Sequence, residues 1–75
     1  MEKVVIINYE NFGIVIVATV KTEVETKQVF ASLESMSSIC FDDLLICNVG
    51  DEIEFMSSYN GDEYGEELEF INILV

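Results

Sequence analysis

Histidine, arginine, proline and tryptophan are absent from this 75-residue sequence, and its only basic residues are Lys3, Lys21 and Lys27. Without histidine the commonest general base is missing, and neither a Ser–His nor a Cys–His catalytic pair can exist. Adjacent acids such as Asp42 and Asp43 would point to opposite faces of a strand, so they do not form a catalytic carboxylate pair. The sequence therefore predicts a protein that is not an enzyme.

Positive charge is scarce, and it is missing altogether after residue 27. Fifteen acids against three lysines give a formal net charge of −12, and 11 of those acids lie in 28–75. Binding to nucleic-acid phosphates or to anionic membranes needs clustered Lys or Arg, so both partners are disfavoured. Such a surface attracts basic proteins or metal cations, and the alternative is that the charge serves only solubility.

Long apolar runs are missing as well. The longest, 14–18, cannot span a bilayer, which takes about 20 residues. The run 4–7 is too short for the apolar part of a signal peptide, which takes about 7 to 15 residues. We therefore expect a cytoplasmic protein in which Cys40 and Cys47 stay reduced.

Neither a metal nor a cofactor is predicted. A zinc site at the two cysteines would have to recruit carboxylates in the absence of histidine, and we favour the alternative of two small core or rim thiols. The acids and glycines of 60–67 suggest a divalent-cation site. They do not follow the calcium-loop pattern Asp-x-Asp/Asn-x-Asp/Asn-Gly, however, so this site is not part of the prediction.

What the sequence does contain is enough apolar side chain for one core. Hydrophobic residues make up 51% of the chain, which predicts a single folded domain over 1–75. Dense Val and Ile, interrupted by short polar or glycine-containing turns, favour strands over helices. The predicted strands are 4–7, 12–20, 25–33, 53–56 and 67–75.

The segment 34–48 is the least strand-like part of the chain. Its apolar side chains recur at helical spacing, and Ser37 or Ser38 could cap a short helix. The residues that carry this periodicity are Met36, Ile39, Cys40, Leu44 and Cys47. Three strands, a helical or irregular insertion and two further strands is the order of a small five-stranded oligonucleotide-binding (OB) barrel, an all-β fold.

Several motifs strengthen this interpretation, because together they resemble the bacterial cold-shock domain over nearly the whole chain. The segment 3–14 is similar to the family's opening Gly-x-Val-Lys-Trp-Phe-Asn and Lys-Gly-Phe-Gly-Phe-Ile, with one loop residue missing. The further matches are Val-Phe-Ala-Ser-Leu at 29–33, Phe-Asp-Asp-Leu at 41–44, Gly-Asp-Glu-Ile-Glu-Phe at 50–55, and Gly65 with Ile71.

The resemblance implies a surface that stacks nucleic-acid bases on aromatic rings, but most of those rings are replaced. Phe12, Phe30 and Phe41 stand at three of the family's stacking positions. Each ring contributes about 1 to 3 kcal/mol to single-strand binding, so the loss of the others should remove most of the affinity. The replaced aromatic positions hold Ile6, Ile14, Ser32 and Leu33, and Val5 and Asp42 replace two of the family's lysines.

Two hypotheses about function follow. The first is a small non-enzymatic interaction protein that imitates nucleic-acid phosphates and inhibits a basic nucleic-acid-binding protein or enzyme, as small phage inhibitors do. The second is a degenerate cold-shock-type binder of single-stranded DNA or RNA through Phe12, Phe30 and Phe41. The residues proposed to meet the basic partner of the first hypothesis are Asp42, Asp43, Asp62, Glu63, Glu66 and Glu67.

Self-association is a further expectation. Residues 14–17 place apolar side chains on both faces of one strand, and a small barrel buries only one face within itself. The other face should meet the helical insertion, another protein or a second copy of the chain in a homodimer.

The charge makes a prediction about salt. Because 15 acids share a small surface, their repulsion should destabilise the fold in dilute buffer and added salt should screen it. The melting temperature should therefore rise between dilute buffer and several hundred millimolar sodium chloride, measured by circular dichroism. An unchanged or lower melting temperature would mean that neighbouring groups already compensate the acids.

Overall fold

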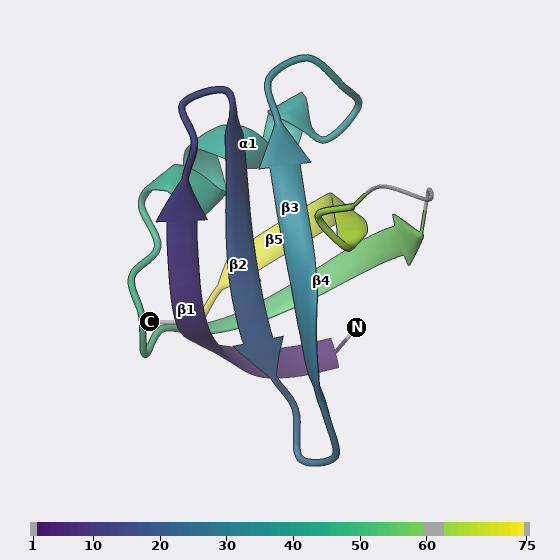
Figure 1. The fold of residues 1–75 in the computed structure, drawn as a ribbon. Helices are drawn as coiled ribbons and strands as arrows, with labels where there is room; N and C mark the ends of the chain where they lie inside the picture. Colours follow the sequence, from purple (N-terminus) through teal and green to yellow (C-terminus); the bar gives the residue numbers. More distant parts are fainter. Residues whose placement is uncertain (1, 60–62, 75) are drawn as a thin grey trace.

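Five strands form a closed barrel with one short helix between the third and fourth strands (Figure 1). The computed structural model describes residues 2–59 and 63–74. The strand order around the barrel is β1-β2-β3-β5-β4, with β4 returning to β1. The elements are β1 (Glu2–Asn11), β2 (Val15–Lys21), β3 (Thr26–Ser32), α1 (Ser38–Leu45), β4 (Glu52–Tyr59) and β5 (Glu66–Ile73). The predicted all-β, OB-like barrel with a helix after its third strand is confirmed.

The first strand is longer than predicted, because it belongs to both halves of the barrel. Its first residues pair with β4 and its later residues pair with β2, with a bulge between Ile6 and Asn8. The polar residues after Ile7 suggested that the strand would end there. They continue it because only one face of this strand needs to be apolar. Tyr9 is half-buried, and its hydroxyl donates a hydrogen bond to the carbonyl of Leu45, 3.1 Å away.

The core lies inside the barrel and under the helix. Alternate residues of β2, namely Ile16, Ala18 and Val20, are completely buried, as the strand period of two requires. The helix closes one end of the barrel with three buried side chains, Cys40, Phe41 and Leu44. The three strands before the helix and the two after it therefore share one core.

The helix differs from the prediction on its outer side. Cys40, Leu44 and Cys47 are buried as expected, but Met36 is 84% exposed and Ile39 is 77% exposed. A short helix that lies on the end of a barrel has only one side to bury, so the full apolar period is not used. Ser37 occupies the position before the helix, but its hydroxyl accepts a hydrogen bond from the Ser32 amide, 2.8 Å away, and caps no helical amide.

Gly65 fixes the approach of β5 to β3. Its φ is +99°, a conformation that L side chains rarely adopt, and an added Cβ would clash with the carbonyl oxygen of Gln28. The turn at Glu63–Tyr64 can thus reach the outer surface of β3 only because residue 65 has no side chain.

This contact predicts that Gly65→Ala destabilises the protein more than Gly13→Ala. Gly13 has a similar φ of +95°, but a Cβ there would meet nothing within 4 Å. Both variants incur backbone strain of about 1 to 3 kcal/mol, and only Gly65→Ala adds the clash with β3. Chemical denaturation would measure the difference, and equal free energies of unfolding for the two variants would contradict the role given to the Gly65–Gln28 contact.

Candidate functional site

An aromatic group covers the outer face of β2 and β3. Phe30 lies opposite Val17 across these strands and is only 3% exposed. The ring centroid of Tyr64 lies 5.9 Å from that of Phe30 and 6.1 Å from that of Phe12. Tyr64, which the sequence analysis did not single out, therefore lies against Phe30 on the face where the resemblance places nucleic-acid bases.

The three predicted stacking residues are in three different environments. Phe12 is 57% exposed, Phe30 is buried beside Tyr64, and Phe41 is 5% exposed in the core under the helix. Ile6, which aligns with a stacking ring of the family, is also completely buried in the core. Of the three phenylalanines, only Phe12 presents a large part of its ring to solvent in this conformation.

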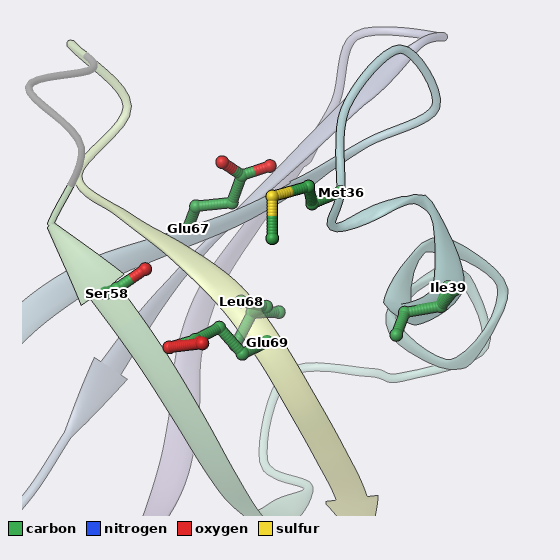
Figure 2. Close-up of a pocket in the computed structure, with 6 residues that line it drawn as sticks. All are labelled: Met36, Ile39, Ser58, Glu67, Leu68 and Glu69. Atoms are coloured by element: carbon green, nitrogen blue, oxygen red, sulfur yellow. The ribbon is translucent and has the colours of Figure 1, made fainter.

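A second surface lies between α1 and the last two strands. A pocket of about 280 Å³ opens there, and Figure 2 shows its lining side chains around Leu68. Met36 and Ile39 come from the helix side, whereas the other residues come from β4 and β5. The pocket is lined by Met36, Ile39, Ser58, Glu67, Leu68 and Glu69.

Two carboxylates, those of Glu67 and Glu69, line this pocket from the strand side. Asp42 and Asp43 follow Ile39 by three and four residues on α1, but neither lines the pocket. Both acids are exposed, as is Glu69 on the strand side. No lysine lines the pocket among the described residues. The pocket therefore combines an apolar floor with a negatively charged rim.

Glu66, by contrast, has partners within the protein. The Ser57 hydroxyl donates a hydrogen bond of 2.6 Å to its carboxylate, and the Lys27 ammonium lies 3.5 Å from the same oxygen. The Ser57 bond is the main reason that the pKa of Glu66 is lowered, and the charge of Lys27 adds to it. Lys27 also lies over the Phe55 ring, 5.3 Å from its centroid.

Glu67 also has partners within the protein. Its carboxylate accepts hydrogen bonds from the Ser35 hydroxyl and from the Ser37 amide, the latter at 3.2 Å. Met36 stands between these two serines, so Glu67 holds the loop that forms one wall of the pocket. Glu66 and Glu67 were predicted as partner-binding acids, and in the structure both brace the barrel.

The remaining predicted acids are distributed over two elements. Asp42 and Asp43 lie on the helix, whereas Glu63 lies in the turn before Tyr64, and all three are exposed. Asp62 lies outside the described residues. Among the predicted acids that the structure describes, the structure thus brings Glu67 to the pocket, leaves Asp42 and Asp43 on α1, and leaves Glu63 beside the aromatic group.

The two thiols are buried and unreactive in character. Burial raises the pKa of Cys47 to about 11, and the nearby charges of Asp51 and Asp43 add to this effect. Burial also raises the pKa of Cys40. Both cysteines are free. Within 2–59 and 63–74, no group of three or more His, Cys, Asp or Glu side chains could hold a metal ion.

Within the part of the chain that the structure describes, no helix has the length and the apolar character that crossing a membrane requires. Comparisons with protein-family models, with curated proteins and with solved structures gave no match to this chain.

The Ser57–Glu66 bond predicts how stability changes with acid. Because the folded pKa of Glu66 lies below its ordinary value of 4.5, this group stabilises the fold above that value. The contribution is lost as the pH falls through the folded pKa. Ser57→Ala should raise the pKa of Glu66, measured by carboxyl NMR, and reduce the difference in melting temperature between neutral and acidic pH.

The control is Ser58→Ala, at the exposed neighbouring residue. It should leave the pKa of Glu66 unchanged. If Ser57→Ala also left that pKa unchanged, the hydrogen bond would not be the cause of the shift.

Proposed function

We propose that this chain is a non-enzymatic interaction protein whose carboxylates bind a basic surface of another protein. The observation that carries the proposal is the pocket beside α1, where the exposed side chains of Met36 and Ile39 face the carboxylates of Glu67 and Glu69. Protein interfaces combine an apolar centre with a polar rim in this way. A rim of one charge favours a partner of the opposite charge and raises the rate of encounter.

The long-range field supports a basic partner as well. Of the three lysines, Lys27 is paired with Glu66, so little positive charge offsets the 15 acids. A nucleic-acid-binding protein or enzyme presents the complementary surface, because it is built to attract phosphates. In this proposal the acids take the place of those phosphates, and binding would inhibit the partner.

The second candidate is a divergent cold-shock-type protein that binds single strands, and one observation favours it. Phe12 and Tyr64 lie together on the outer face of β2 and β3, and aromatic rings on such a face can stack bases. The negative charge of the chain opposes this function, so it ranks second.

The first proposal predicts that a subset of the acids controls association. Asp42→Asn, Asp43→Asn and Glu63→Gln together change the formal charge from −12 to −9 at exposed residues. Association with a basic partner, captured from the native host by the immobilised protein and then purified, should slow, because fewer charges steer the encounter. Stopped-flow fluorescence would give the rate and its dependence on salt.

The matched control is Glu23→Gln, Glu25→Gln and Glu52→Gln, which gives the same formal charge through exposed acids that lie on neither α1 nor the turn before Tyr64. It should slow association less. If the two triple variants associate at the wild-type rate, the acids serve only solubility. If a labelled oligonucleotide binds at low salt and Phe12→Ala weakens that binding, the second candidate is favoured instead.

A further inference from the structure

We infer that the pocket between α1 and β5 binds a segment of the partner that carries a large apolar side chain next to lysine or arginine. This inference rests on the proposed function and deepens it, because it names the place and the chemistry of recognition. The floor of the pocket is Leu68, and its open wall is formed by Met36 and Ile39 (Figure 2).

The size of the pocket decides what kind of group it accepts. Its volume of about 280 Å³ is close to the lower end of ligand pockets, about 300 Å³. It suits one apolar side chain and its flanking backbone. Met36 adapts its unbranched side chain to different shapes, as methionine does at other protein-binding surfaces.

The wall of the pocket is held in place before a partner arrives. Glu67 binds both Ser35 and Ser37, the residues on either side of Met36. Since the loop is already ordered by these bonds, binding does not have to supply the entropy of ordering it. Leu68 is also fixed before binding, because its side chain packs in the core of the barrel.

Charge identifies the partner. Glu67 and Glu69 line the pocket from the strand side. A cationic residue next to the inserted side chain would meet the exposed carboxylate of Glu69. A second copy of this chain would instead bring another net charge of −12 to the same rim, so charge complementarity favours a basic partner over a homodimer.

The probe is a fluorescein-labelled amphipathic peptide of about 12 leucine and lysine residues. Two comparison peptides replace every leucine with glutamine or every lysine with glutamate. The variant is Ile39→Gln with Glu69→Gln, and the matched control is Val24→Gln with Glu23→Gln at the tip of the β2–β3 hairpin. Val24 is 90% exposed, and each double variant removes one acid and one exposed aliphatic side chain.

We expect the leucine–lysine peptide to bind the wild-type protein, with fluorescence anisotropy as the measurement. The pocket variant should lose at least about tenfold in affinity, and the control should lose less than about threefold. The glutamine–lysine peptide should bind more weakly than the leucine–lysine peptide, and the glutamate peptide should not bind. The Met36 methyl NMR signal should shift when the leucine–lysine peptide is added.

Three results would overturn the inference. The first is an equal loss of peptide affinity in the two double variants, and the second is equal affinity of the wild-type protein for the leucine–lysine and glutamine–lysine peptides. Both would mean that general charge attraction binds the peptide. Either result leaves the proposed function standing. No binding of either lysine peptide would overturn the proposed function together with the pocket. Both double variants change exposed residues, and melting temperatures equal to that of the wild-type protein would show that the variants are folded.

Discussion

The barrel closes between β3 and β5 through two residue pairs only, Val29 with Glu66 and Phe30 with Glu67. All other strand contacts in the barrel are longer antiparallel pairings. A parallel ladder this short contributes little by itself, so neighbouring groups must support it. Gly65 lets the backbone of β5 approach Gln28, and Tyr64 lies against Phe30 on the outside of the same junction.

The polar groups at this junction differ in their contributions. An exposed ion pair stabilises a fold by about 0 to 1 kcal/mol, whereas a hydrogen bond to a charged group contributes about 1.5 to 3 kcal/mol. Lys27 and Glu66 are partly exposed, so the Ser57–Glu66 bond matters more than the ion pair. By the same comparison, the two hydrogen bonds that the Glu67 carboxylate accepts from Ser35 and Ser37 contribute most among the polar contacts on the helix side of the junction.

The fold could be predicted from the sequence because alternation and turn residues are local signals. Ile16, Ala18 and Val20 alternate with less buried neighbours, and that period alone places them inside a sheet. The environment of the acids could not be predicted in this way. Glu66 and Glu67 resemble any other pair in an acidic stretch until β5 is placed beside β3, and their serine partners are distant in the sequence.

The same limit applies to the pocket and to the aromatic face. The apolar period from Met36 to Cys47 indicates a helix, but it does not say that Met36 and Ile39 lie beyond the edge of the barrel. Tyr64 gives no signal in the sequence, because its contact with Phe30 depends on the close approach at Gly65. Phe41 matched a family motif, yet the helix turns it into the core.

Barrel closure therefore has opposite effects on the two surfaces that could bind a partner. At the aromatic face, the turn that ends in Gly65 brings Tyr64 onto Phe30 and reduces the ring area open to a base. At the pocket, Glu67 fixes the loop that carries Met36 and keeps apolar side chains exposed. Exposed apolar groups promote association between identical chains, and a high net charge of one sign opposes it. Under the proposed function, the acids that discourage self-association are therefore also the groups that select a basic partner.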